Sequence, residues 1–132
     1  MKRDMDFLRL LILEIEAGKD WYETTSDEIA EILQVEARGL SKADAERLEY
    51  HLTLLEDAGL AEFTKTGDGW IPERLTWAGH DFADSVRDEE VWRKTKEGAQ
   101  AAKGFTVDLL RALAKGFLKK QIEDRTGIAL DL

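Results

Sequence analysis

The stretch that decides the fold is residues 41–60, which read SKADAERLEYHLTLLEDAGL. Ser41 is a favourable N-cap residue, and Asp44 adds a carboxylate to the first turn, where the helix dipole favours negative charge. Apolar side chains then recur at helical spacing, at Ala45, Leu48, Leu52 and Leu55. Gly59 suits the left-handed position after a helix end, and Leu60 suits the apolar contact that accompanies it. The stretch therefore predicts an amphipathic helix from Ser41 to Ala58.

The next residues, 61–82, read AEFTKTGDGWIPERLTWAGHDF. The glycine-rich turn at residues 67–69 separates two short runs that predict a hairpin, with 70–76 as its return strand. Pro72 cannot donate to a strand ladder, which predicts that this strand lies at an edge or carries a bulge. Thr76 can cap another helix. Helix, stop, hairpin and helix in this order are typical of winged-helix domains. The sequence thus predicts a mostly α fold with a small β-hairpin, built as a winged helix-turn-helix core.

Two helices are expected before the winged-helix cassette, by which we mean residues 41–82. Residues 4–17 are apolar nearly all round, which predicts a helix central to the core. The linker at residues 19–23 has room for a short extended piece. Thr25 and Glu28 have the spacing of a capping box and predict a short second helix that ends near residue 35. The apolar residues of this helix fall on one face: Ile29, Ile32 and Leu33.

The C-terminal part of the chain reads as a helical extension. A helix beginning near Val91 is interrupted by Gly104, and a last helix covers residues 106–122, with one apolar side formed by Leu110, Leu113, Phe117 and Leu118. We therefore divide the chain into a winged-helix-like domain, residues 1–87, and a helical C-terminal extension, residues 88–132. We expect this extension to dimerise or to dock on another surface.

Composition limits the functions open to the chain. Its 132 residues carry a formal net charge of −9 and no cysteine, which excludes disulfides, thiolate chemistry and Cys-ligated zinc. Charged residues interrupt the apolar N-terminal run, which is neither a signal peptide nor a membrane span. We expect a cytoplasmic protein that does not bind membranes. Residues 91–120 alone are basic, with eight Lys or Arg against two Asp or Glu.

The winged-helix cassette predicts a surface that could contact duplex DNA. Its candidate nucleic-acid contacts are Lys42, Arg47, Lys65 and Arg74. The exposed face of helix 41–58 is nevertheless expected to hold more acids than bases, and affinity for DNA comes largely from Lys and Arg at phosphates. Binding of DNA requires the four basic residues to form one patch, whereas binding of a protein predicts an exposed apolar or aromatic patch.

Aromatic and basic residues elsewhere suggest protein contacts. Tyr50 lies on the expected exposed face of helix 41–58. Trp70 and Trp77 could anchor a partner, although sealing the small core is the more ordinary role of such tryptophans. The last helix presents basic residues beside its apolar stripe, which favours packing on the winged-helix domain or on a second chain. The candidate partner contacts are Tyr50, Trp70, Trp77, Arg111, Lys115 and Lys119.

Signals for chemistry are weak. His51 and His80 are the only histidines, and neither lies in a metal-binding motif, so we expect no metal and no cofactor. A helix histidine bonded to backbone or to a carboxylate is the ordinary alternative. No serine stands beside a recognisable base, and the turn at residues 67–69 is too short for a phosphate loop. We expect a protein that is not an enzyme.

Several strings resemble a known family. The start MKRDMD at residues 1–6, YHL with LL and AGL within residues 50–60, and RLTWAGHDF at residues 74–82 are similar to an uncharacterised family common in bacterial prophages and mobile elements. The resemblance runs nearly end to end, through residues 104–106. It implies a small cytoplasmic phage-type protein with a winged-helix-like core and no known activity.

Two functions follow as hypotheses. The first is a non-enzymatic regulatory or adaptor protein that binds a protein partner and forms a homodimer through its C-terminal helices. The alternative is a winged-helix transcriptional regulator that reads DNA with helix 41–58 and the wing at residues 61–76.

Overall fold

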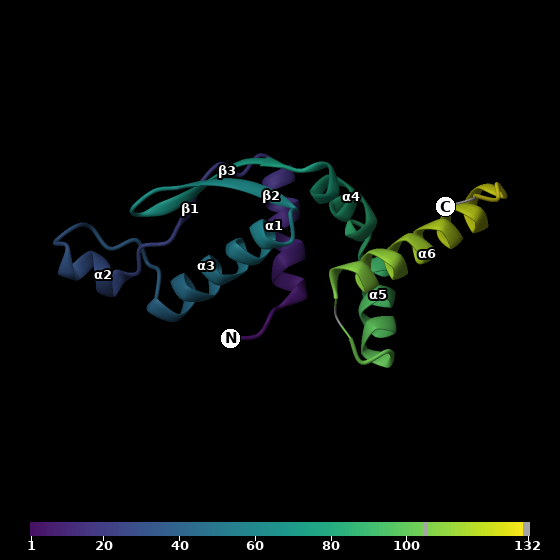
Figure 1. Cartoon of the computed structure of the whole chain (residues 1–132), viewed down its shortest axis with the longest axis horizontal. Helices are drawn as coiled ribbons and strands as arrows, with labels where there is room; N and C mark the ends of the chain where they lie inside the picture. The colour runs from purple at the N-terminus through teal and green to yellow at the C-terminus, as the bar shows by residue number, and fades with distance from the viewer. Residues whose placement is uncertain (105, 131–132) are drawn as a thin grey trace. The chain divides into compact units, whose positions relative to one another are not determined.

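The computed structural model describes residues 1–104 and 106–130; Phe105, which belongs to the family resemblance, and the last two residues of the predicted extension lie outside the described residues. The elements are α1 (Met5–Glu16), β1 (Tyr22–Glu23), α2 (Asp27–Ile32), α3 (Lys42–Asp57), β2 (Ala61–Lys65), β3 (Gly69–Leu75), α4 (Trp77–Val86), α5 (Glu89–Ala101) and α6 (Val107–Thr126) (Figure 1). The chain is therefore mostly helical with one small antiparallel sheet. It forms two compact units, 1–80 and 81–132, which divide within α4.

Helix α1 supplies much of the core of the first unit. Asp4 is its N-cap and accepts a hydrogen bond from the Phe7 N–H at 3.1 Å. Its buried residues recur at helical spacing and face α3 and β3: Met5, Leu8, Leu11, Ile12 and Ile15. Leu10 is 51% exposed, so the helix is central on one side only.

Helix α3 ends as its sequence predicts. Ser41 caps its first turn, and Gly59 follows the last turn with a φ of +69°. The Gly59 N–H donates to the Glu56 carbonyl at 3.0 Å, and the Leu60 N–H donates to the Leu55 carbonyl at 2.9 Å. These two bonds form a Schellman motif and satisfy carbonyls that the helix end would otherwise leave without donors.

The sheet has three strands in the order β1-β3-β2, all antiparallel. Strand β1 is the short extended piece expected in the linker. Strand β3 lies in the middle of the sheet and its pairing with β2 carries a bulge, the second of the two alternatives predicted from Pro72. The register shifts between Glu62 and Phe63, and Phe63 is the Pro72 partner. Strand β1 reaches only Gly69 and Trp70 on β3, so no ladder bond from β1 is required at Pro72.

Helix α2 differs from the prediction in its cap and its length. Ser26, not Thr25, is the N-cap and accepts from the Ile29 N–H at 3.3 Å. The Thr25 hydroxyl instead donates to the Asp68 carbonyl of the hairpin turn at 3.2 Å. The helix ends at Ile32, because Gln34 adopts a left-handed φ of +57°. Only Ala30 of the helix is buried, so the apolar face formed by Ile29, Ile32 and Leu33 is exposed.

The end of α3 is joined to the start of α4 by Thr76. Its hydroxyl donates to the Gly59 carbonyl at 2.5 Å, and its N–H donates to the Leu60 carbonyl at 3.0 Å. The same hydroxyl accepts from the Gly79 N–H at 3.0 Å, which caps α4 as predicted. A Cβ on Gly79 would strike the Leu60 carbonyl oxygen. The AGL and LTWAGH strings therefore meet in one junction, where glycine permits the close approach of two backbones.

The second unit pairs α5 with α6. Asp88 caps α5, and the buried side chains of the two helices include Val91, Trp92, Thr95, Ala99, Leu110 and Ala114. Helix α5 ends at Ala101 before a left-handed Lys103 (φ +55°), so the residue that turns the chain is not Gly104 as predicted. Helix α6 continues to Thr126, one turn beyond the predicted end at residue 122, and Gly127 follows it with a φ of +71°.

Candidate functional site

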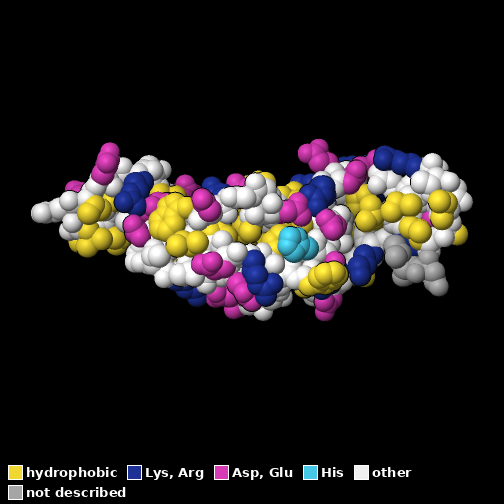
Figure 2. Space-filling view, turned by 90° about the horizontal axis from the view of Figure 1, so that it is seen from above, with side chains coloured by type: hydrophobic (Ala, Val, Ile, Leu, Met, Phe, Trp, Pro, Cys, Tyr) yellow, Lys and Arg dark blue, Asp and Glu magenta, His cyan; other side chains and the backbone are white. Residues whose placement is uncertain are grey.

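The candidate nucleic-acid contacts come from three parts of the first unit. Lys42 is the first residue of α3, Arg47 lies one turn later, and Lys65 and Arg74 lie on β2 and β3. On the face shown in Figure 2, Lys and Arg side chains are interspersed with Asp and Glu rather than gathered in one area. What each cation contacts decides whether it is available to a phosphate.

Arg47 is held against the start of α1. Its Nη2 lies 2.8 Å from Asp4 Oδ2, and its guanidinium carbon lies 4.0 Å from the centre of the Phe7 ring. Although partial burial acts in the opposite direction, the Phe7 N–H and the Arg47 guanidinium lower the pKa of Asp4 below its ordinary value. Arg47 therefore already has an anion and an aromatic surface within its own chain.

His51 lies buried beneath this pair. Its Nε2 accepts from the Asp4 N–H at 2.9 Å, and its Nδ1 lies 2.7 Å from the Arg47 carbonyl oxygen. Because a carbonyl can only accept, the ring is assigned as the tautomer with a proton on Nδ1. Both ring nitrogens are engaged, so His51 has the ordinary backbone-bonded role expected for a helix histidine. His80, in contrast, is exposed.

The two basic residues of the hairpin are also paired. Lys65 Nζ lies 2.9 Å from Glu56 Oε1 at the end of α3 and 4.6 Å from the centre of the Trp70 ring. Arg74 makes two bonds across the hairpin to Glu62, at 2.9 and 3.0 Å. Surface pairs of this kind add little stability, but each places a carboxylate where a phosphate would have to bind.

Lys42 is the one candidate of the four for which the described residues provide no anion. Its neighbours on α3 are nevertheless acidic, since Glu46 and Glu49 are exposed on the same helix. The four basic residues are thus engaged separately or surrounded by acids, and the single basic patch that DNA binding requires is not assembled from them.

The candidate partner contacts of the first unit separate into buried and exposed groups. Trp70 is only 4% exposed and packs edge-on against Phe63, with ring centres 5.3 Å apart, so it has the core-sealing role that was the more ordinary of the two expected for it and is not available to anchor a partner. Trp77 is 83% exposed and remains available. Tyr50 is half-buried and contacts the His51 ring edge-on.

The basic candidates of the second unit lie along α6. Lys115 is exposed, whereas Arg111 and Lys119 are half-buried. Lys119 Nζ lies 3.8 Å from Glu123 Oε1 on the next turn. The buried side of α6 packs against α5. Leu113 of α6 lies so close to Gly98 of α5 that a Cβ on Gly98 would be 3.3 Å from Leu113 Cδ1.

A larger exposed apolar surface was not recognised as such in the sequence. It lies on α2 and the turn after it, and we call it the α2 ridge: Ile29, Ile32, Leu33 and Val35. Ile32 is 69% exposed and Leu33 is 62% exposed. Helix α2 lies beside the N-terminal end of α3 and away from α1 (Figure 1), and hydrophobic side chains are visible at that end of the molecule (Figure 2). Clustered exposed apolar side chains of this kind mark interaction surfaces.

A groove of about 230 Å³ lies between the start of α2 and α3. Its lining includes the apolar side chains of Ile29 and Ala45 and three carboxylates, from Glu28, Glu46 and Glu49. Lys42 is its one basic lining residue. The groove and the ridge share Ile29, so together they form one continuous surface with an apolar part and an acidic part.

The short helix is held in place by its first residue. Asp27 Oδ1 accepts from the backbone N–H groups of Arg38, Gly39 and Leu40 at 2.9 to 3.1 Å. The Asp27 N–H in turn donates to the Leu40 carbonyl at 2.7 Å. These bonds fix both ends of the α2 segment without covering its apolar side chains, so the ridge is exposed on an anchored element.

Arg38 connects this segment to the sheet. Its Nη1 lies 2.6 Å from Glu23 Oε2 on β1 and 3.5 Å from Asp68 Oδ2 in the hairpin turn. These two carboxylates, with burial opposing them, raise the pKa of Arg38. Arg38 is therefore engaged within the chain and does not offset the carboxylates of the groove.

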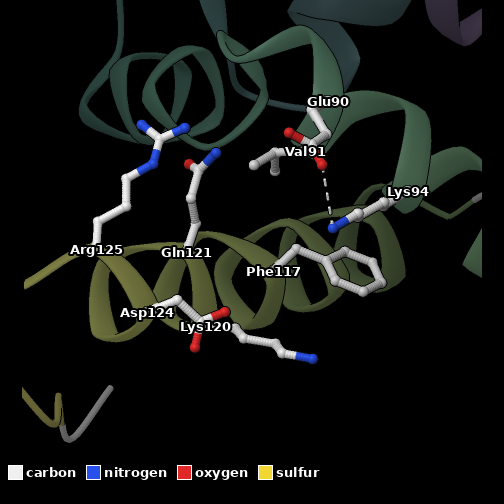
Figure 3. Close-up of a pocket in the computed structure, with 8 residues that line it drawn as sticks. All are labelled: Glu90, Val91, Lys94, Phe117, Lys120, Gln121, Asp124 and Arg125. Carbon is white, nitrogen blue, oxygen red and sulfur yellow. Dashed lines mark ion pairs between the residues drawn. The ribbon is translucent and has the colours of Figure 1, made fainter. Parts of the chain in front are cut away.

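The second unit has its own groove, between α5 and α6, with a volume of about 290 Å³ (Figure 3). Glu90 and Lys94 form an ion pair across one helical turn at 3.4 Å. Figure 3 shows Gln121 and Arg125 pointing from α6 toward the start of α5. The Val91 N–H, and then Gln121 and Arg125, lower the pKa of Asp88 at that helix start. Lys120 and Asp124 complete the charged lining of this groove.

The described ranges, 1–104 and 106–130, contain no group of three or more His, Asp or Glu side chains placed to hold a metal ion. Within the same ranges, no helix combines the length and the apolar composition that a membrane crossing requires. Among the surfaces that the first unit offers to other molecules are the α2 ridge with its groove, the exposed Trp77, and the largely paired basic residues.

Comparison with known proteins gives a family but no activity. An uncharacterised protein of Haemophilus influenzae is 26% identical over 133 residues, which cover 92% of this chain and 99% of that protein. No solved structure matches the chain. The family described as "Hypothetical protein (DUF2513)" matches residues 2–106, most of the chain. The chain therefore belongs to the DUF2513 family.

Proposed function

We propose that this chain is a non-enzymatic regulatory or adaptor protein, of the kind that mobile elements encode, which acts through protein contacts on a winged-helix scaffold. The order α1, β1, α2, α3, β2, β3, with β3 in the middle of the sheet, supports that scaffold. The observation that carries the proposal is the α2 ridge, because four apolar side chains are exposed together on an anchored helix.

The state of the basic residues supports protein rather than DNA as the partner. Three of the four candidate DNA contacts have a carboxylate of the same chain at 2.8 to 2.9 Å. To bind a phosphate, each would have to give up that carboxylate. The carboxylate would then remain near the DNA backbone and repel it, which lowers the gain from counterion release.

The alternative function is a winged-helix regulator that reads DNA with α3 and the β2–β3 hairpin. The position of Lys42 at the start of α3, without an anion among the described residues, is the observation that favours it. A homodimer that combined the Lys42 side chains of two copies would strengthen this alternative.

Fluorescence anisotropy with a random pool of duplex DNA, measured over a series of salt concentrations, separates the two functions. We expect no binding even at low salt, because the basic residues are paired and the chain carries a net charge of −9. Binding that weakens steeply with salt and is lost in a Lys42→Gln variant would instead establish the DNA-binding alternative. The control is Asp57→Asn, which removes a negative charge from the same helix, whereas Lys42→Gln removes a positive charge.

Light scattering on the same samples tests the homodimer. The proposal includes self-association through α6, supported by its half-buried apolar side chains Leu109, Phe117 and Ile122. A mass near twice the chain mass of 15.0 kDa is the expected result. A mass equal to one chain would remove the dimer from the proposal and leave the partner surface on the first unit unaffected.

A further inference from the structure

We infer that the α2 ridge and its groove bind a cationic amphipathic helix of a partner protein. This inference rests on the proposed protein-contact function and names the chemistry of the partner. Its evidence is the combination, on one surface, of unpaired apolar side chains and unpaired carboxylates.

The α2 ridge supplies the apolar contacts expected for this partner helix. Ile29, Ile32 and Leu33 recur at the spacing of one helix face, and Val35 continues the surface beyond the last turn. An amphipathic helix that docks in a groove presents apolar anchors at the same spacing, so two such faces can bury one another. The ridge side chains are exposed and do not support the core, which leaves them available for that contact.

The acidic half comes from carboxylates that have no cation within the described chain. Glu28, Glu46 and Glu49 line the groove, and no basic side chain of the described residues pairs with them. Five other carboxylates of the first unit each have an Arg or Lys partner, namely those of Asp4, Glu23, Glu56, Glu62 and Asp68. Three carboxylates without a cation among the described residues therefore lie together in the groove, beside the exposed side chain of Ile29.

These charges select among the possible occupants. Two copies meeting through this surface would bring the same carboxylates face to face, and like charges across an interface cost free energy. DNA is excluded by the same repulsion. A helix with Leu-type anchors and Lys or Arg beside them would satisfy both halves of the surface, and the attraction of opposite charges would also favour its approach.

The test uses the full chain and synthetic peptides of about 14 residues, long enough to form a helix on binding. The first peptide has Leu on one helical face and Lys on the other. The second replaces every Lys with Glu, and the third is a scrambled Leu/Lys sequence without an apolar face. Peptide anisotropy is measured with the natural chain, with two test variants, and with a control variant. The test variants are Ile32→Ser with Leu33→Ser, and Glu46→Gln with Glu49→Gln.

We expect the amphipathic Leu/Lys peptide to bind, and binding to weaken about tenfold in the Ile32 and Leu33 variant. Removing the Glu46 and Glu49 charges should weaken it about fivefold. The control variant, Asp20→Asn with Asp57→Asn, removes two exposed charges elsewhere and should change affinity less than about twofold. Because all six positions are exposed or lie outside the core, circular dichroism should show every variant folded.

Several results would overturn the inference. The first is no binding of the Leu/Lys peptide, and the second is equal binding of the scrambled peptide. The third is a loss of affinity in the Asp20 and Asp57 control equal to that in the Glu46 and Glu49 variant, which would indicate general attraction to an acidic chain. Ridge-dependent binding of the Leu/Glu peptide would overturn the cationic partner but leave the protein-contact function in place. Self-association that the Ile32 and Leu33 variant abolishes would identify a second copy as the occupant. Failure of the proposed function itself has a separate readout, which is binding of duplex DNA.

Discussion

Replacing Gly79 with Ala is expected to destabilise the first unit by about 3 kcal/mol. This value lies at the upper end of the costs usually found when a substitution adds atoms to a well-packed core. The new Cβ would strike the Leu60 carbonyl oxygen and would lie 3.3 Å from Leu75 Cβ. Neither obstacle is a flexible side-chain end, so α4 would have to move away from the end of α3. That movement would also break the bonds of Thr76 to the Gly59 and Leu60 carbonyls.

The measurement is urea denaturation followed by circular dichroism, with Gly116→Ala as the matched control. Gly116 also lies inside a helix, and a Cβ there would meet nothing within 4 Å. The control should therefore stabilise its helix by about 0.5–1 kcal/mol, the ordinary gain of Gly to Ala in a helix interior. A Gly79→Ala chain as stable as the natural chain would contradict the junction described between α3 and α4.

Replacing His51 with Ala is expected to cost about 3 kcal/mol. The ring is 1% exposed, contacts Phe7 edge-on with ring centres 5.0 Å apart, and accepts the Asp4 N–H at the start of α1. The variant would leave a cavity and an N–H without its acceptor, and both losses destabilise the folded chain. His51→Leu keeps most of the volume but not the hydrogen bonds, so it should cost about 1–3 kcal/mol.

His80→Ala is the control for this series, because His80 is exposed and surface substitutions usually change stability by about 0.5 kcal/mol or less. Denaturation curves of the three variants separate packing from hydrogen bonding at His51. Equal stability of the His51→Ala and His80→Ala chains would show that the ring does not connect α1 to α3 as described.

Local signals in the sequence predict the parts of the fold that local physics determines. Ser41 and Gly59 define α3 because a cap and a left-handed glycine act on the nearest backbone groups. Pro72 predicts the bulge for a similar reason, since its missing N–H prevents a regular ladder. The helices and the hairpin were therefore predictable to within about one turn at their ends.

The candidate site was less predictable because it depends on which surfaces remain uncovered. An apolar spacing such as Ile29, Ile32, Leu33 is the same for a helix that packs on its own core and for one that packs on a partner. Trp70 and Trp77 carry equivalent local signals, yet strand pairing buries the first and leaves the second exposed. The pairing of Arg47 with Asp4 joins residues 43 positions apart, which no local pattern indicates.

The signal that could have identified the α2 ridge is the shortness of its helix. A helix of six residues has one buried position here, Ala30, and its first residue, Asp27, is bonded to the backbone of the following loop rather than to the core. Short, strongly capped helices with more apolar residues than they can bury therefore deserve consideration as contact surfaces.

The most direct test of the central claim, that this protein acts through protein contacts at the α2 ridge, is site-specific photocrosslinking in the cells that produce it. A photoreactive residue is placed at position 32 on the ridge, at position 42 on α3, and at position 10, which is exposed on α1. We predict a crosslink to one protein from position 32 and not from position 10. Crosslinks to DNA from position 42, with none to protein from position 32, would contradict the claim.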